Sequence, residues 1–165
     1  KFSMVQKVRE EKVLSFLRRF DLLSVIFVMQ VVYGAFTAGL NAGHVYNTFP
    51  LMAGEWFPKA FFDFSPWWAN FFDHIAGVQF IHRMLGWIAL FLAVAVYIHG
   101  HNTIADQEIR WWIGILVVLI VLQFLLGVAT LLTHVLIPLA SWHQVNATLI
   151  LLAMVHVRFL LRRAK

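Results

Sequence analysis

The chain has 165 residues, a formal net charge of +5, and a composition that is 61% hydrophobic and only 13% charged. Soluble globular domains carry about 25% charged residues, so this composition, with a mean hydropathy of +0.78, excludes a soluble domain and indicates a membrane protein. Because the chain has no cysteine, it cannot itself build a disulfide, a thiolate metal site or an iron–sulfur cluster.

Stretches without charge predict the membrane-spanning segments. No Asp, Glu, Lys or Arg occurs in residues 22–54, 84–105 or 111–157, and one spanning helix needs about 20 apolar residues. The third stretch is long enough for two spans and contains Pro138, a residue that interrupts or starts helices. Lipid admits only helices or closed barrels, and long apolar runs without alternation favour helices. We therefore predict an all-α membrane protein, an antiparallel bundle of four helices at about residues 22–40, 78–98, 111–133 and 139–161.

The segments outside these spans set the predicted orientation. They include a basic linker (residues 1–21), a long loop (41–77) and a basic tail (162–165). Basic residues gather at both ends and at Arg110, between the second and third spans, whereas the long loop has only Lys59. The positive-inside rule then places both termini on the cytoplasmic or matrix side. These membrane anchors account for the net charge, so no nucleic-acid partner is expected.

A short motif occurs twice in the chain. "QVVYGAFT" (residues 30–37) lies in the first predicted span and "QFLLGVAT" (123–130) in the third, and both read Q-x-x-x-G-x-x-T. Each is followed by a span with a histidine near its start. We interpret the chain as two helical hairpins of one design, with the long loop inserted into the first. The alternative is that the small residues of both motifs only mediate helix packing, as small residues commonly do in membranes.

Two of the eight histidines are predicted to lie at the same depth. His82 and His143 each stand about four residues inside a span, or roughly 6 Å along a helix that rises about 1.5 Å per residue. Their spans run in the same direction, so the two imidazoles can face each other across the bundle core, where cofactor sites are commonly built. One turn after each histidine is a small residue, Gly86 and Ala147 respectively. The alternative is that each histidine is only a buried, hydrogen-bonded polar group.

Haem suits such a pair better than a bare metal ion does. A zinc ion wants three or four protein ligands, and no cluster of Cys, Asp or Glu is present to complete a set. A haem iron takes two axial imidazoles, and the forked donors of the neighbouring Arg83 suit a haem propionate. The remaining histidines, including His134, are interpreted as interfacial or loop residues. In the long loop, Tyr46, Asn47 and Trp56 are candidates for covering the haem edge or contacting an electron donor.

Four stretches resemble one protein family. They are "GAFTAGLNAGHVYNTFPLM" (residues 34–52), "FDFSPWWANFF" (62–72), "VQFIHRMLGW" (78–87) and "PLASWHQVNATLILL" (138–152). Over residues 22–161 the chain is similar to the carboxy-terminal half of haem A synthases, inner-membrane enzymes of aerobic bacteria and mitochondria. The first and third stretches carry long and specific motifs, unlike a bare pair of histidines.

This resemblance implies a fold of eight spans in two pseudo-symmetric four-helix halves, of which this chain is one. It implies that this half holds a haem b ligated by His82 and His143, while the amino-terminal half takes the substrate, haem O. The implied reaction is oxidation of the C8 methyl of haem O to a formyl, in haem A biosynthesis for cytochrome oxidase. The other residues expected at the haem b site are Arg83, Gly86, Gln144 and Ala147.

The residue three positions before His82 distinguishes the two halves. The resemblance implies an essential glutamate there in the amino-terminal half, whereas this chain has Gln79. An amide cannot take up or deliver a proton near neutral pH. We therefore expect this half to bind haem b and pass electrons, and not to be catalytic alone. Many relatives have Asp at the positions of Asn41 and Ile81, so hydrogen bonding near the haem is not transferred from them.

The expected partners also follow from the resemblance. They are membrane lipid, the amino-terminal half of the same protein, haem O synthase (a farnesyltransferase) and a ferredoxin-type or quinol electron donor; a homo-oligomer is kept as an alternative. The expected location is an inner membrane, bacterial rather than mitochondrial because nothing resembles a mitochondrial extension. Two other functions remain open: a non-enzymatic b-type cytochrome that transfers electrons, and a transporter with a histidine relay, which the loop motif "YNTFP" disfavours.

Overall fold

The structure, a computed structural model, describes residues 2–163, with side chains described from residue 11 onward. Its long helices are α1 (Phe2–Gly39), α2 (Ile75–Thr103), α3 (Gln107–Leu132) and α4 (Ile137–Arg163). Each of α2, α3 and α4 is long and apolar enough to cross a membrane, and so is the Glu11–Gly39 part of α1. The predicted all-α membrane fold with four spans is confirmed. Helix α1 also continues through most of the segment expected to be a basic linker.

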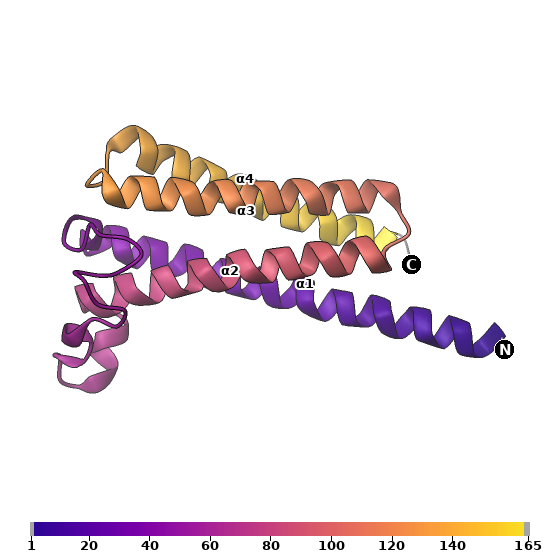
Figure 1. The fold of residues 1–165 in the computed structure, drawn as a ribbon, viewed down its shortest axis with the longest axis horizontal. Helices are drawn as coiled ribbons and strands as arrows, with labels where there is room; N and C mark the ends of the chain where they lie inside the picture. Colours follow the sequence, from indigo (N-terminus) through magenta and orange to yellow (C-terminus); the bar gives the residue numbers. More distant parts are fainter. Residues whose placement is uncertain (1, 164–165) are drawn as a thin grey trace.

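The helices form two antiparallel hairpins that lie side by side (Figure 1). The first hairpin is α1 packed on α2, the second is α3 packed on α4, and the two meet where α2 packs on α3. One end of the bundle carries the segment 40–74 and the turn between α3 and α4; we call it the loop end. The opposite, terminal end carries the turn between α2 and α3 and the last turn of α4. Since α2 and α4 both begin at the loop end, they run parallel to each other.

The apolar core lies mainly toward the terminal end. In lipid, helices associate through close van der Waals packing rather than through the hydrophobic effect, and the packing here is tight. A Cβ added at Gly100 of α2 would lie 2.8 Å from a ring carbon of Phe16 and 3.1 Å from Ile113. The buried side chains of this core include Phe16, Phe20, Leu23 and Phe27 of α1, Val96 of α2, Ile113 and Leu116 of α3, and Ile150 and Val157 of α4.

Local signals in the sequence account for the helix boundaries. At the start of α3, the Asp106 carboxylate accepts hydrogen bonds from the backbone N–H groups of Glu108 (2.8 Å) and Ile109 (3.1 Å), as an N-cap residue does. At the start of α4, Pro138 occupies a first-turn position, where its missing N–H leaves no hydrogen bond unmade. Helix α1 ends at Gly39, and Asn41 then takes a left-handed conformation with φ 53°, which asparagine tolerates better than most residues.

The segment 40–74 folds over the loop end through three short 3-10 helices, η1 (Ala42–His44), η2 (Lys59–Phe62) and η3 (Trp67–Phe71). Asn70 is fully buried and organises this segment: its amide donates to the carbonyls of Phe64 and Trp67, and its oxygen accepts from the N–H of Phe64. Gly77 of α2 lies directly beneath, where any Cβ would overlap the carbonyl oxygen of Asn70. Close approach of the loop to α2 therefore requires glycine at this position.

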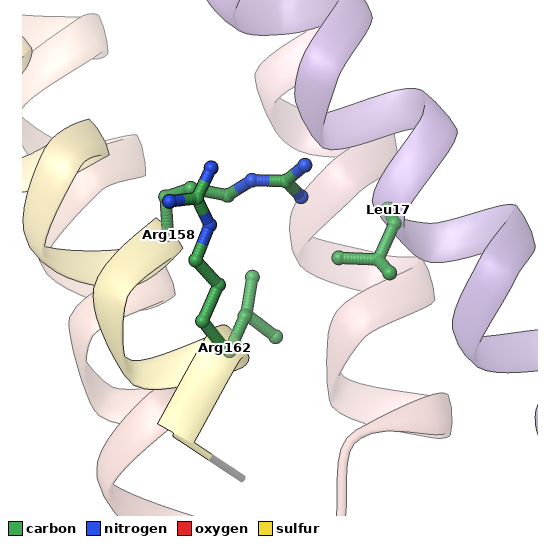
Figure 2. Close-up of a pocket in the computed structure, with 4 residues that line it drawn as sticks. Leu17, Arg158 and Arg162 are labelled. Atoms are coloured by element: carbon green, nitrogen blue, oxygen red, sulfur yellow. The ribbon is translucent and has the colours of Figure 1, made fainter. Parts of the chain in front are cut away.

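At the terminal end, α4 is tied to α1 by charge. The Arg158 guanidinium lies 3.2 Å from the Asp21 carboxylate. Figure 2 shows Arg158 extending from α4 toward α1, with Arg162 beside it. These two residues, Leu17 and Leu161 line a pocket of about 80 Å³. Because both partners of the ion pair are substantially exposed, its contribution to stability is small, on the order of 0–1 kcal/mol. This end is rich in basic side chains, and the pocket there is far too small for a macrocycle.

Candidate functional site

In the first hairpin, His82 of α2 packs against one face of α1. A Cβ added at Gly34 would lie 3.2 Å from the Cε1 atom of His82, so the imidazole lies where a side chain would otherwise be. One turn earlier on α1, the amide nitrogen of Gln30 lies 3.5 Å from Nε2 of the same imidazole. Residues four apart share a helix face. Gln30 and Gly34 of the first Q-x-x-x-G motif thus contact His82 together, and we call such a pair the seat of its histidine.

The second hairpin repeats this arrangement. A Cβ added at Gly127 of α3 would lie 2.9 Å from Cε1 of His143, which is on α4. The amide nitrogen of Gln123, one turn earlier on α3, lies 3.3 Å from Nε2 of His143. The two motifs therefore hold the two histidines in the same way, with glutamine at a ring nitrogen and glycine at the ring edge. The small residues do mediate helix packing, and what they pack against is an imidazole.

Helix α2 lies between the two seats. Gly86, one turn after His82, lies between them: a Cβ there would be 3.4 Å from the Gln30 amide nitrogen and 4.0 Å from Phe124 of α3. Trp87 packs its ring on that of Phe124 with centroids 4.6 Å apart. Phe49 of the loop stacks on Trp87 at 5.8 Å. An aromatic cluster therefore joins the two hairpins beside the histidine seats.

Buried polar atoms without a hydrogen-bond partner gather at the loop end. Leaving such an atom unpaired costs about 1–3 kcal/mol, and a cluster of them in a native fold calls for a missing ligand or solvent as its explanation. Within the described part of the chain, those at the loop end are Gln30 Oε1, His74 Nδ1, Gln79 Oε1, His82 Nδ1, Arg83 Nε, Thr130 Oγ1 and His143 Nδ1. Nearer the terminal end, the side chains described from residue 11 onward contribute such atoms only at His99 and His156. The loop end is thus a polar site within an apolar bundle.

Arg83 holds the loop over this site. Its guanidinium donates to the backbone carbonyls of Tyr46 (2.6 Å), Thr48 (2.8 Å) and Leu51 (3.3 Å). Only the Nε donor of Arg83 lacks a partner. These carbonyls belong to the "YNTFPL" stretch, so the arginine after the histidine fixes the conformation of that stretch. Contact of Arg83 with a haem propionate stays a prediction.

Gln79 also ties α2 to the loop. It is 2% exposed, and its Nε2 donates to the carbonyls of Ala42 (3.0 Å) and Tyr46 (3.3 Å). An ionised carboxylate here would face two hydrogen-bond acceptors and could donate to neither. The amide at residue 79 therefore has a structural role, which is to hold the loop on α2. Sequence reasoning interpreted Gln79 only as the absence of an acid and missed its donor role.

The other predicted site residues differ in where they lie. Ala147 is half-buried and packs against the apolar core. Gln144 is exposed, and its backbone carbonyl accepts from the hydroxyl of Thr148. The contacts predicted between these residues and haem stay predictions, as does that of Gly86. Of the loop candidates, Asn47 donates to the carbonyl of Leu131 at the end of α3, whereas Trp56 is 75% exposed.

The donor set suits a haem better than a bare ion. In the described residues, no three His, Cys, Asp or Glu side chains are grouped closely enough to hold a metal ion. What the loop end offers is one neutral nitrogen ligand from each hairpin, each resting against a glycine. A haem iron takes its remaining ligands from the macrocycle. Two imidazoles, a cluster of unpaired buried polar atoms and small residues at the ring edges are consistent with this cofactor.

A family model described as cytochrome oxidase assembly protein matches residues 3–155. The chain belongs to the cytochrome oxidase assembly protein family. The resemblance inferred from the four sequence stretches is confirmed at this level, because the curated members that the chain matches include proteins named heme A synthase. No solved protein structure matches the chain.

Three of these family members illustrate the extent of similarity. The heme A synthase of Wolbachia sp. subsp. Brugia malayi is 41% identical over 123 residues, which are 74% of this chain and 35% of that protein. That of Nitrosospira multiformis is 37% identical over 142 residues, 86% of this chain and 40% of that protein. That of Paracoccus denitrificans is 39% identical over 142 residues, 84% and 37% of the two chains. The chain thus spans well under half the length of these relatives.

Proposed function

We propose that this chain is the carboxy-terminal, haem b-binding half of a haem A synthase, with His82 and His143 as the axial ligands. The observation that carries the proposal is the matched pair of seats, Gln30 with Gly34 and Gln123 with Gly127. Each seat presents one imidazole at the loop end, on parallel helices. Membership of the cytochrome oxidase assembly protein family supports the same conclusion.

Bound in this half, haem b supplies one-electron transfer. The protein's own residues would hold the haem. His82 and His143 would supply ring nitrogens, Gln30 and Gln123 orient the two imidazoles before haem binds, and Arg83 keeps the loop closed over them. The loop also places an aromatic ring beside the site, because Phe49 packs against Trp87 and Phe124.

The oxidation of haem O to haem A belongs, in this proposal, to the amino-terminal half. The spans of this chain contain no acidic residue between 22 and 54, 84 and 105, or 111 and 157. Gln79, at the expected position of the acid, uses its amide to hold the loop. The acid–base role expected of a carboxylate at this position is therefore not available from Gln79. The proposed partners are that half, membrane lipid, haem O synthase and a quinol or ferredoxin-type electron donor.

The proposed location is an inner membrane, with the terminal end on the cytoplasmic or matrix side. Basic residues support this orientation: Arg110 lies at the start of α3 near that end, and Arg158, Arg162 and Arg163 lie in the last turns of α4. Cytoplasmic segments of membrane proteins carry an excess of Lys and Arg.

A second candidate is a non-enzymatic cytochrome that only transfers electrons. It is favoured by the amide at residue 79 in a chain that also holds two seated histidines. The two candidates differ in one outcome. Expressed with the amino-terminal half of a relative, this chain yields haem A only if the first proposal is correct.

The proposed haem site is tested by a reduced-minus-oxidised visible spectrum and a haem-to-protein ratio on the purified chain. We expect a low-spin b-type spectrum that is lost in both His82→Ala and His143→Ala. His101→Ala is the matched control, because His101 is exposed near the end of α2 opposite His82; it should keep the spectrum. A colourless wild-type chain after expression with adequate haem, or a spectrum retained in both variants, would refute the proposal.

A further inference from the structure

The second hairpin contains a hydrogen-bonded chain that ends at His143. Asn146, three residues after His143 on α4, is 3% exposed. Its Nδ2 donates to the backbone carbonyl of Leu119 (2.9 Å) and to Oε1 of Gln123 (2.8 Å). The Nε2 atom of Gln123 lies 3.3 Å from Nε2 of His143. One backbone carbonyl, two side-chain amides and one imidazole are therefore connected in series.

The direction of every hydrogen bond in this series follows from its first member. A backbone carbonyl only accepts, so the Asn146 atom facing Leu119 is the NH₂ group. The same group faces Gln123, which must therefore present its oxygen to Asn146. That leaves the NH₂ group of Gln123 facing the imidazole. Because an amide NH₂ only donates, Nε2 of His143 is the acceptor and carries no proton.

We propose that Asn146 and Gln123 are positioning residues that hold His143, in the haem-free chain, in the tautomer with its proton on Nδ1 and an unprotonated Nε2. The inference rests on the proposed function for its purpose: a ring nitrogen that binds iron must be unprotonated. The partner of the other ring nitrogen usually sets which one is free. Here Nδ1 of His143 is buried without a partner, and the selection is made at Nε2 instead.

The first hairpin provides a built-in comparison. Gln30 lies 3.5 Å from Nε2 of His82, but its Oε1 is buried without a partner among the described residues. Nothing fixes which way the Gln30 amide faces. Gln79, the buried amide nearest to His82 in sequence, donates to loop carbonyls instead. We therefore expect a fixed tautomer at His143 and a weaker bias at His82.

The test is the tautomeric state of His143 in the haem-free chain. The chain is labelled with ¹⁵N-histidine and placed in lipid nanodiscs, and long-range ¹H–¹⁵N spectra report which ring nitrogen carries the proton. His143→Ala assigns the signals. We expect the Nδ1-protonated form at His143 in the wild-type chain. A wild-type His143 protonated on Nε2 would overturn the inference without any variant.

Three variants identify the residues responsible. In Gln123→Glu the new side chain has nearly the same volume but ends in a carboxylate, which can only accept hydrogen bonds. It should therefore move the proton of His143 to Nε2. Asn146→Leu frees the Gln123 amide to turn, so a mixture of tautomers is expected. Gln30→Leu is the control and should leave the His143 signals unchanged. A His143 signal that is the same in all three variants would overturn the inference.

Haem affinity provides a second readout. Loss of a residue that orients a ligand commonly weakens metal binding by about 10–100-fold. Titration of haem into the haem-free chain should show weakening at the low end of that range, about 10-fold, for Gln123→Glu, which places the proton on Nε2. Asn146→Leu, which only mixes the two tautomers, should weaken haem binding less. Failure of the proposed function is distinguishable: haem binding would then survive His143→Ala, while the tautomer measurement would still decide the present inference.

Discussion

Gly127 lies directly against the imidazole of His143, so closely that a Cβ at residue 127 would be 2.9 Å from the Cε1 atom of that ring. Gly34 stands in the same relationship to His82, at 3.2 Å. A contact below about 3.0 Å, as at Gly127, forces something to move, and one of 3.2 Å, as at Gly34, requires a shift of a few tenths of an ångström. In both cases the nearest atoms belong to a proposed ligand. The two glycines therefore control where the imidazoles lie.

The first prediction concerns Gly127→Ala. Alanine favours a helix over glycine by about 1 kcal/mol, so the substitution should preserve or raise helix stability. The added methyl should nevertheless displace the His143 ring, and we expect haem affinity to fall by about 10-fold. Haem titration together with thermal unfolding by circular dichroism checks both expectations.

Gly39→Ala is the matched control for this prediction. Gly39 also lies in a helix, but a Cβ there would meet nothing within 4 Å. The Gly39→Ala variant should bind haem with the affinity of the wild-type chain. Equal haem affinity of Gly127→Ala and Gly39→Ala would contradict the role assigned to Gly127.

The second prediction concerns Gln79→Glu. The Gln79 amide donates to two loop carbonyls from a buried position, and a carboxylate would lose both bonds. We expect a loss of about 1–3 kcal/mol in stability and faster hydrogen exchange of residues 42–46. We expect no haem O oxidation by the variant, because the acid alone does not supply the substrate site.

Gln144→Glu is the control for Gln79→Glu, since Gln144 is exposed and its side chain makes no described hydrogen bond. In the Gln144→Glu variant, the backbone amide hydrogens of residues 42–46 should exchange at the wild-type rate. Wild-type exchange in the Gln79→Glu variant would show that Gln79 does not hold the loop.

The third prediction concerns membrane orientation, and the absence of cysteine makes it a clean experiment. Ser65 in the segment 40–74 and Glu108 at the start of α3 are both exposed and lie at opposite ends of the bundle. A membrane-impermeant thiol reagent added outside intact cells should label Ser65→Cys and not Glu108→Cys. After the cells are broken, both should be labelled. The reverse pattern in intact cells would mean that the proposed orientation is wrong.

Much of the fold follows from residue composition. Charge-free stretches of sufficient length predict spanning helices because lipid offers no partner to a free backbone group, and α2, α3 and α4 lie where these stretches were found. Their ends differ by a few residues, since caps such as Asp106 and the loop contacts of Gly77 extend the helices past the apolar part. Helical periodicity alone also predicts that His82 and Gly86 lie on the same face of α2.

The contacts within the candidate site were less accessible from sequence. The repeated Q-x-x-x-G motif was visible, but its contact with the histidines depends on how α1 and α3 are rotated about their axes. The bond from Asn146 to Gln123 depends on the same rotation. Arg83 was predicted to meet a propionate, and its use of loop carbonyls depends on the path of residues 46–51. Side-chain partners between helices are a property of packing, which residue spacing alone does not specify.

The most direct test of the central claim, that His82 and His143 together ligate one haem, is ligand replacement. His82→Met and His143→Met are purified separately and studied by electron paramagnetic resonance and magnetic circular dichroism. Each variant should change from bis-imidazole to imidazole–thioether ligation, with a raised midpoint potential in both. A bis-imidazole spectrum that persists in either variant would contradict the assignment of that histidine.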